Sequence, residues 1–451
     1  MTAPDQPKRQ PDQPARDNPA RYPGQLGGQH PGNGIGQNGN GRNGQDPGFA
    51  GQAPKPGQNG NGRNGQDPGF EGLAPKPGQA VPASGAWQPG DPVGQRQFAQ
   101  LGTFQPEQGG ALDVTVAYET WGQLNPARDN AVLVLHALTG DSHIRGPAGP
   151  GHPTAGWWTK LIGPGAPVDT DRYFVVAPNT LGGCQGTTGP ASMGPDGRPW
   201  GSLFPYITIR DQVQVELALA NYLRIDRWAL VIGGSMGGMR VLEWAVSAPD
   251  RVAKLVPIAT TARSTADQIA WAHAQLAAIR NDPYFLDGDY YDQPDGFGPH
   301  VGLGIARQIA HTTYRSAAEL DARFGQQAQG KEQPLGAGGR YAIVSYLEHH
   351  AGKLALRFDA NSYLVLTESI LSHDVGRDRG GVASALQRVT AQTLVVAVDS
   401  DRLYLPSESA ELAELIPSAL DLHTVHSDYG HDGFLIEFAQ FGPLIAEFLQ
   451  G

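Results

Sequence analysis

A glycine-rich turn with one serine at its centre lies between a predicted strand and a predicted helix. The strand covers residues 228–232, the turn reads Gly-Gly-Ser-Met-Gly-Gly-Met over residues 233–239, and a helical apolar pattern follows over residues 240–247. So sharp a turn leaves no room for side chains beside the serine, so the flanking positions need glycine. We therefore expect Ser235 to project its hydroxyl from a sheet edge as a nucleophile, with a helix N-terminus behind it that favours negative charge. The alternative is a tight turn that merely contains a serine.

Short apolar runs alternate with helical stretches from about residue 93 onward. This alternation is typical of an α/β fold, in which helices cover a mostly parallel sheet. Strands are expected at residues 113–118, 131–135, 173–177, 228–232, 254–259 and 393–398, and helices at residues 213–223 and 240–247. The connection before the last strand is too long for a structureless loop, and its helix-like pieces predict an inserted helical lid over about residues 263–375.

Residues 1 to about 90 differ in composition from the rest of the chain. The chain holds 61 glycines and 37 prolines, and their excess is found in this segment, which has almost no aliphatic side chains. Within it, the stretch at residues 36–49 returns at residues 57–70. Such a segment cannot bury enough apolar surface to offset the entropy of ordering. We expect residues 1–90 to be a disordered extension, either a solvated tail or a tethering arm, and residues 91–451 to form the catalytic domain.

Charge and cysteine content exclude several classes of protein. The formal net charge of −11 is unlike that of a nucleic-acid-binding protein, which needs clustered lysines and arginines. The single cysteine allows neither an intramolecular disulfide nor a thiolate-rich metal site. We find neither a secretory leader nor a run of 18 apolar residues, so no membrane partner is expected. Together these features predict a cytoplasmic protein.

A serine nucleophile needs a base within hydrogen-bond reach and an acid that orients the base. In sheets with a nucleophile turn of this kind, the acid and then the histidine follow the serine along the chain. The strand at residues 393–398 is followed by Asp399 and Asp401, and either qualifies by position. His423, His426 and His431 compete as the base. The polar loop around His431, just before the last helix, favours that residue.

Two backbone N–H groups must stabilise the oxyanion that forms during acyl transfer. Met236 follows the serine and supplies the first. The loop after the strand at residues 131–135 supplies the second, and Leu138 is the expected donor. His136 and His143 in this loop raise the question of a metal, but no cysteine or carboxylate cluster accompanies them at ligand spacing. We expect no metal.

Taken together, the motifs resemble the homoserine O-acetyltransferase family of α/β-hydrolase-fold acyltransferases, from about residue 93 to the C-terminus. Many α/β-hydrolases share the serine turn, but few share the whole set. The matching stretches lie at residues 138–143, 156–158, 162–165, 169–175, 182–190, 204–205, 207–211, 233–239 and 430–432.

The resemblance also implies the roles of particular residues. The family's acid stands in a Ser-Asp-x-Leu-aromatic pattern that matches residues 400–404 and selects Asp401, and its base stands in a Gly-His-Asp pattern that selects His431. On the lid, Arg307 matches the arginine that holds the amino acid's carboxylate, and Tyr314 matches an adjacent polar contact. A guanidinium binds a carboxylate through two hydrogen bonds, and Asp432 is placed to bind the substrate's ammonium group.

The activity that the resemblance implies is transfer of the acetyl group of acetyl-CoA to the hydroxyl of L-homoserine, in methionine biosynthesis, through an acyl-enzyme on Ser235. Acetyl-CoA is then a co-substrate, no cofactor is bound, and the enzyme is a homodimer. An O-succinyltransferase acting on homoserine or serine is an alternative, because it would use the same triad with a pocket for the longer acyl group. A serine esterase is more remote, since it would not need a cation and an anion placed for an amino-acid zwitterion.

Overall fold

A computed structural model describes residues 81–335 and 338–451. Its main sheet has the strand order β1-β2-β6-β3-β7-β8-β10-β11, with β9 beside β8. The pairs β1–β2 and β2–β6 are antiparallel, and the other pairs are parallel. The strands are β1 (Gln97–Phe104), β2 (Leu112–Trp121), β3 (Ala131–Leu135), β6 (Phe174–Pro178), β7 (Leu230–Gly234), β8 (Lys254–Ile258), β9 (Gln392–Thr393), β10 (Val396–Val398) and β11 (His423–Val425), while β4 (Ile162–Gly163) and β5 (Val168–Asp169) form a second small sheet.

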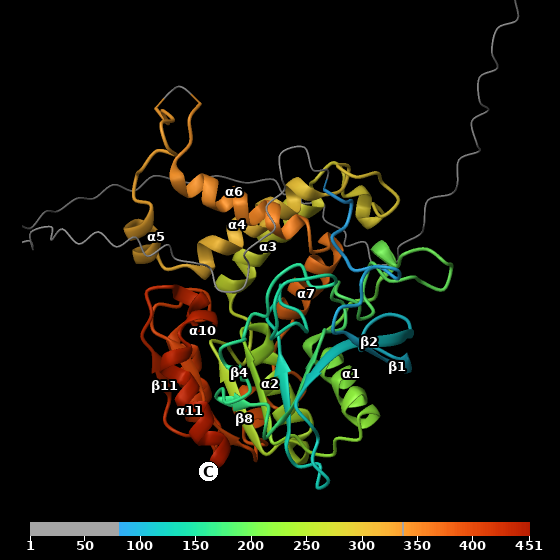
Figure 1. Ribbon diagram of the computed structural model, residues 1–451, viewed down its shortest axis with the longest axis vertical. Helices are drawn as coiled ribbons and strands as arrows, with labels where there is room; N and C mark the ends of the chain where they lie inside the picture. The colour runs from blue at the N-terminus through green and yellow to red at the C-terminus, as the bar shows by residue number, and fades with distance from the viewer. Residues whose placement is uncertain (1–80, 336–337) are drawn as a thin grey trace, which may run out of the picture. The chain divides into compact units, whose positions relative to one another are not determined.

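Helices flank the sheet and form a long insertion after β8 (Figure 1). Those outside the insertion are α1 (Ile209–Tyr222), α2 (Met236–Ser247), α8 (Val382–Leu386), α9 (Pro406–Leu415), α10 (Gly433–Ile436) and α11 (Phe438–Gln450), with η1 (Gly201–Leu203), η2 (Pro249–Arg251) and η4 (Gly430–Asp432). The insertion carries α3 (Ala266–Arg280), η3 (Leu286–Gly288), α4 (His300–Tyr314), α5 (Ala317–Arg323), α6 (Ala342–Ala355) and α7 (Ala360–Leu371). Within the described ranges, no helix is both long and apolar enough to cross a membrane.

Successive side chains of a strand point to opposite faces of the sheet, and an apolar cluster covers each face. In β3, Leu133 and Leu135 belong to the apolar cluster that includes side chains of α1, α2, α8 and α9. Val132 and Val134 belong to the opposite cluster, which includes the apolar face of α11. Both sides of the central strands are therefore covered, and the ends of these strands are left for the site.

A third apolar cluster joins the insertion to the carboxyl ends of the strands. It contains Leu276 of α3, Leu303 of α4 and Tyr363 of α7, together with Leu138 from the loop after β3 and Met236 at the start of α2. The insertion helices lie together above the sheet in Figure 1. Because this cluster is apolar and buried, the insertion is packed onto the residues from which we expect the oxyanion donors.

One helix outside the insertion, α1, and one within it, α3, begin where their sequences place N-terminal caps. Thr208 before α1 accepts the N–H of Asp211, and Thr265 before α3 accepts the N–H of Gln268. In each case the acceptor side chain of the third helical residue bonds back to the threonine N–H, which completes a capping box. The capping signal thus accounts for where these two helices start.

The disordered segment expected over residues 1–90 reaches too far along the chain. Residues 81–90 were expected to be disordered, yet the structure describes them. The N–H of Gly85 donates to the Phe358 carbonyl over 3.3 Å, and the N–H of Trp87 donates to the Cys184 carbonyl over 2.9 Å. An average over a glycine-rich window hides one short run that has partners elsewhere in the fold. The rest of the expected extension, residues 1–80, lies outside the described residues.

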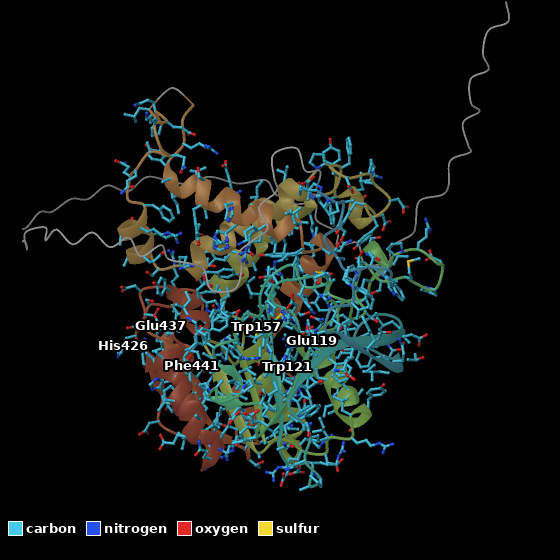
Figure 2. All side chains as sticks on the ribbon, viewed as in Figure 1. Glu119, Trp121, Trp157, His426, Glu437 and Phe441 are labelled. Atoms are coloured by element: carbon cyan, nitrogen blue, oxygen red, sulfur yellow. The ribbon has the colours of Figure 1, made fainter. Side chains whose placement is uncertain are left out.

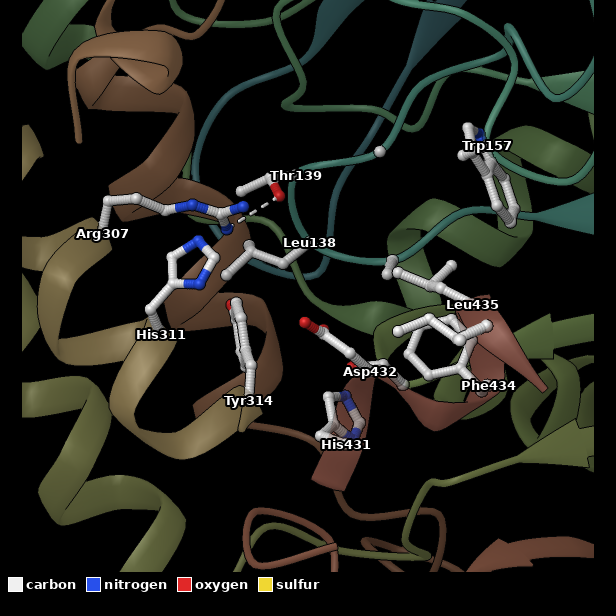
Figure 3. A pocket seen from close by; sticks show the side chains of 14 residues that line it. Leu138, Thr139, Trp157, Arg307, His311, Tyr314, His431, Asp432, Phe434 and Leu435 are labelled. Atoms are coloured by element: carbon white, nitrogen blue, oxygen red, sulfur yellow. Dashed lines mark hydrogen bonds between the residues drawn. The ribbon is translucent and has the colours of Figure 1, made fainter. Parts of the chain in front are cut away.

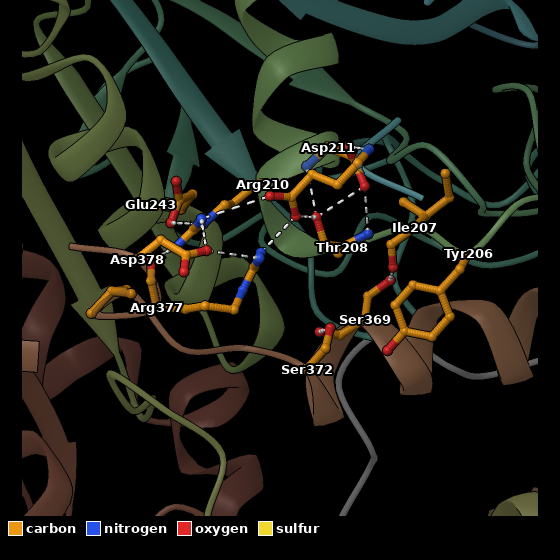
Figure 4. A network of polar contacts seen from close by, with 12 residues as sticks. Tyr206, Ile207, Thr208, Arg210, Asp211, Glu243, Ser369, Ser372, Arg377 and Asp378 are labelled. Atoms are coloured by element: carbon orange, nitrogen blue, oxygen red, sulfur yellow. Dashed lines mark hydrogen bonds and ion pairs between the residues drawn. The ribbon is translucent and has the colours of Figure 1, made fainter. Parts of the chain in front are cut away.

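A network of ion pairs fastens the end of the insertion to α1 and α2 (Figure 4). Arg379 contacts both carboxylate oxygens of Glu243, with Nη2–Oε1 at 2.5 Å and Nη1–Oε2 at 2.8 Å. Arg377 donates to Glu107 over 2.6 Å. Arg210 of α1 lies between, at 3.6 Å from Glu107 and 4.0 Å from Glu243. Since Glu243 is 1 % exposed, its charge depends on these cations.

Replacing Arg379 with leucine is expected to lower the free energy of unfolding by about 1.5–3 kcal/mol, because the buried carboxylate of Glu243 loses both hydrogen bonds from Arg379. The control is Arg198→Leu, since the pair between Arg198 and Asp196 has side chains 52 % and 46 % exposed. An exposed pair of this kind contributes at most about 1 kcal/mol. Urea unfolding of both variants measures the difference. Equal losses in the two variants would contradict the role given to the Arg379–Glu243 pair.

Candidate active site

The serine turn joins β7 to α2. Ser235 has φ 58° and ψ −126°, a strained backbone conformation that points the side chain out of the turn. The surrounding positions have no room for a side chain. A Cβ at Gly237 would lie 2.1 Å from the carbonyl oxygen of Leu135, and a Cβ at Gly234 would lie 2.5 Å from the ring of Phe434. The close approach of β3 and α10 therefore accounts for Gly234 and Gly237.

Asp401 and His431 come together from loops that follow β10 and β11. Nδ1 of His431 lies 2.7 Å from Oδ2 of Asp401, and because a carboxylate only accepts, this nitrogen carries the hydrogen. The other oxygen of Asp401 accepts the N–H groups of Leu403 and Tyr404 at 2.8 and 3.0 Å. Both members of the pair are 3 % exposed. This tautomer leaves Nε2 of His431 as the proton acceptor.

Opposing effects set the pKa of His431. Burial disfavours the charged imidazolium and lowers the pKa. The negative charge of Asp401, its hydrogen bond and the nearby charge of Asp432 favour the imidazolium and outweigh burial, so the pKa lies above 6.5. The ring is therefore suited to hold a proton taken from a neighbouring group.

The competing acid and histidines lie elsewhere. His426 pairs with Asp399 through Nδ1 and Oδ2 at 2.9 Å, and these side chains are 81 % and 41 % exposed. Figure 2 shows His426 at the periphery of the molecule. His423 belongs to β11. Among the described residues that line the cavity at Ser235, Asp399 and these two histidines do not occur.

The two expected oxyanion donors lie beside the serine. Met236 is the first residue of α2, so its N–H is one of those that a helix leaves unpaired. Leu138 lines the same cavity as Ser235. The loop of Leu138 is anchored from β2, because Glu119 accepts the hydroxyl of Ser142 over 2.8 Å. This anchor fixes the backbone from which the second N–H would point.

A cavity opens at Ser235 between the insertion and the loop after β11 (Figure 3). Side chains of α4 form one wall, and Trp157 lies on the opposite side with Phe434 and Leu435 of α10. The lining includes Leu138, Thr139, Trp157, Ser235, Arg307, His311, Tyr314, His431, Asp432, Phe434 and Leu435. Six of the eight residues singled out in the sequence thus border one cavity. Of the other two, Met236 follows Ser235 in the chain and Asp401 bonds to His431.

The cavity contains a buried cation and an anion. Arg307 is 6 % exposed, and its Nη1 donates to the hydroxyl of Thr139 over 3.3 Å. The ring of Tyr314 lies 5.5 Å from the guanidinium carbon of Arg307. Asp432 lies across the cavity and pairs with Arg315, with Nε–Oδ2 at 3.0 Å. In Figure 3 its carboxylate points toward the α4 side chains.

Comparison with known proteins places this site in a family. A family model described as "alpha/beta hydrolase fold" matches residues 130–438. The homoserine O-acetyltransferase of Thermobifida fusca is 61 % identical over 371 residues, which make up 82 % of this chain and 97 % of that protein. The chain belongs to the homoserine O-acetyltransferase family. The family and the fold class predicted from the sequence are confirmed.

Solved structures include another protein named for the homoserine O-acetyltransferase family. The enzyme from Bacillus anthracis has a TM-score of 0.73 and 25 % identity, over 79 % of this chain and 97 % of that one. Esterase E22 has a TM-score of 0.72 and 28 % identity, over 78 % of this chain and 99 % of that one. The acyltransferase and the esterase therefore share the fold, and the contents of the cavity must distinguish them.

Sequence reasoning did not single out several residues at this homoserine O-acetyltransferase family site. Tyr404 lies with its ring 5.2 Å from that of His431 and its hydroxyl beside Ser235, and the acid motif had marked it only as aromatic. Thr139 contacts Arg307, and Arg315 contacts Asp432. Both contacts join residues that are far apart in the sequence. His311 follows Arg307 by four residues, so its helical spacing was a usable signal.

One group of possible metal ligands does occur among the described residues. Potential ligand atoms of Glu119, His143 and His152 lie within 4.8 Å of one another, and all three residues are buried. The sequence had offered no carboxylate cluster at ligand spacing near His143, because Glu119 comes from β2. Nδ1 of His143 lies 3.0 Å from Glu119, and Nε2 of His152 accepts the N–H of Gln95 over 2.8 Å. These bonds occupy one nitrogen of each histidine and tie the group to the Leu138 loop and to the backbone of Gln95.

Proposed function

We propose that this protein transfers the acetyl group of acetyl-CoA to the hydroxyl of L-homoserine through an acyl-enzyme on Ser235. The observation that carries the proposal is the presence of a cation, Arg307, and an anion, Asp432, in the cavity that holds Ser235 and His431. An amino acid presents a carboxylate and an ammonium group at fixed separation, and this cavity offers the buried Arg307 to the first and the partly exposed Asp432 to the second. A simple ester needs neither partner.

In the first half-reaction, Nε2 of His431 takes the proton of Ser235, and Oγ attacks the thioester carbonyl. The N–H groups of Leu138 and Met236 stabilise the oxyanion. The carbon–sulfur bond then breaks, His431 returns the proton to the sulfur, and free CoA leaves. Asp401 keeps the imidazole in the required tautomer and stabilises its charged form throughout.

In the second half-reaction, homoserine takes the place of CoA. Arg307 holds its carboxylate, with Tyr314 adjacent, and Asp432 holds its ammonium group. The homoserine hydroxyl gives its proton to His431 and attacks the acetyl carbonyl, after which Ser235 recovers the proton and O-acetylhomoserine leaves. The insertion, at about residues 263–375, acts as a lid on the cavity, and it must keep water from the acyl-enzyme.

Several finer statements belong to the same proposal. Acetyl-CoA is a co-substrate that departs as CoA, and the enzyme needs no resident cofactor. Family resemblance supports a homodimer, and the single cysteine together with the biosynthetic activity supports a cytoplasmic location. A succinyltransferase remains the alternative that differs least, because it would require only a longer acyl pocket beside the same residues.

An assay of the purified protein with acetyl-CoA or succinyl-CoA, each combined with L-homoserine or L-serine, tests the proposal. We expect CoA release to be fastest for acetyl-CoA with homoserine. Each acyl-CoA is also incubated without an amino acid, which measures hydrolysis. Hydrolysis as fast as transfer would favour an esterase, and faster turnover with succinyl-CoA would replace the acetyltransferase with its alternative.

The pH dependence of acylation tests the base. Only neutral His431 accepts a proton, and its pKa lies above 6.5, so the acylation rate falls as the pH drops through a midpoint above 6.5. Asp432→Asn removes a charge that raises this pKa and should move the midpoint to lower pH. The burst of CoA release without homoserine measures the acylation rate. Asp428→Asn, at an exposed position, is the control and should leave the midpoint in place. A midpoint that stays or rises in Asp432→Asn would refute the role of His431.

A further inference from the structure

His311 is a residue of the α4 wall to which the proposed function gives no role. Arg307, His311 and Tyr314 are spaced by four and three residues, so they lie on one face of the helix, and all three line the cavity. His311 is 3 % exposed. Figure 3 shows its ring between the guanidinium of Arg307 and the ring of Tyr314.

Two buried nitrogen atoms of this wall lack a hydrogen-bond partner among the described residues. They are Nε2 of His311 and Nε of Arg307. Buried polar atoms in folded proteins nearly always have partners, so unpaired atoms at a cavity wall indicate a bound group that completes them. Both atoms belong to the same helix face, which points to one ligand group with two acceptor positions.

The hydrogen-bonding state of His311 follows from its surroundings. Its Nδ1 lies 3.4 Å from the hydroxyl oxygen of Tyr346, and when that hydroxyl donates to Nδ1, the hydrogen of the neutral ring resides on Nε2. Burial lowers the pKa of His311 well below 6.5. The charges of Arg307, His350, Arg315 and Lys353 lower it further. With Tyr346 as the donor to Nδ1, the neutral ring presents Nε2–H beside a permanent cation.

We propose that His311 and Arg307 together bind the carboxylate of the amino-acid acceptor, with Nε2–H of His311 as the second donor. This inference rests on the proposed function and assigns an acceptor-selecting residue within it. A carboxylate has two oxygens and suits a guanidinium and an imidazole N–H side by side. The ammonium group cannot occupy this wall because several cations surround it. The acceptor therefore enters with its carboxylate toward α4 and its ammonium toward Asp432, which directs its hydroxyl to His431.

Two substitutions separate hydrogen bonding from packing. His311→Leu removes the donor, and His311→Gln keeps an amide N–H that can replace it. Each variant is assayed with L-homoserine and with L-homoserinamide, whose neutral carboxamide lacks the charge that the site binds. We expect kcat/KM for homoserine to fall by about 10- to 100-fold in His311→Leu, mainly through KM, with partial recovery in His311→Gln. The preference for homoserine over homoserinamide should shrink in the leucine variant.

Acylation of Ser235 by acetyl-CoA alone, followed by intact mass, should remain unchanged in both variants. His349→Leu, on the exposed side of α6, is the control and should match the wild type. The inference is overturned if His311→Leu retains wild-type kcat/KM for homoserine, if homoserine and homoserinamide lose equally, or if acylation itself fails in the folded protein. Absence of homoserine transfer by the wild type would instead overturn the proposed function and this inference together, so the two failures are distinguishable.

Discussion

Ser235→Ala abolishes the release of CoA from acetyl-CoA, with a loss of at least about 10⁴-fold. Without the hydroxyl no acyl-enzyme forms, and the donors at Leu138 and Met236 have no covalent intermediate to stabilise. The backbone of this turn needs φ 58° at residue 235, and alanine adopts that conformation no less readily than serine. The variant is therefore expected to fold, and a thiol reagent that detects free CoA measures its activity.

A matched control for this variant is Ser202→Ala. Ser202 lies in η1, and its hydroxyl bonds to Asp289. It should release CoA at the wild-type rate. Thermal melting of both variants shows whether they fold. Normal turnover by a folded Ser235→Ala protein would exclude Ser235 as the nucleophile.

Arg307→Leu separates the two half-reactions. The lost charge-assisted contact to the amino acid's carboxylate is worth roughly 2–4 kcal/mol, so transfer to homoserine should fall by about 30- to 1000-fold. Acylation by acetyl-CoA does not use that carboxylate and should survive. Intact mass measurement of the variant after incubation with acetyl-CoA and homoserine should then reveal an accumulated acetyl adduct.

The control for Arg307 is another arginine of the insertion. Arg323 of α5 has a 38 % exposed side chain and pairs with Glu319, outside the cavity. Arg323→Leu should transfer acetyl groups at the wild-type rate and accumulate no adduct. Loss of acylation in Arg307→Leu, or homoserine transfer at the wild-type rate, would show that Arg307 does not hold the carboxylate.

The central strands could be predicted because each is a continuous apolar run that is buried on both faces. Residues 131–135 coincide with β3, and the expected strand at 254–259 is β8 with one residue more. The sheet edges were missed. β1 has a mixed burial pattern, and β11 has only three residues, so neither carries a clear apolar signal. In place of the expected strand at 393–398 there are two short strands, β9 and β10, with residues 394–395 between them.

The site was predictable where backbone sterics constrain the sequence. Only glycine fits at positions 234 and 237, so the turn can be recognised in the sequence. The acid was not, because Asp399 and Asp401 follow the same strand, and the residues alone left both open. Their different environments, one at the surface with His426 and one buried with His431, follow from packing. His311 was signalled only by its helical spacing from Arg307, and this spacing does not show whether the histidine is buried in a cavity wall.

The central claim is that Ser235 carries an acetyl group between acetyl-CoA and homoserine, and a single chase experiment tests it most directly. The full chain is incubated with acetyl-CoA and freed of small molecules. Peptide mass mapping of one portion locates the adduct, and another portion is mixed with L-homoserine. We predict an acetyl group on the peptide that contains Ser235, and its disappearance as an equal amount of O-acetylhomoserine forms. An adduct on another residue, or an acetyl group on Ser235 that homoserine does not remove, would contradict the account.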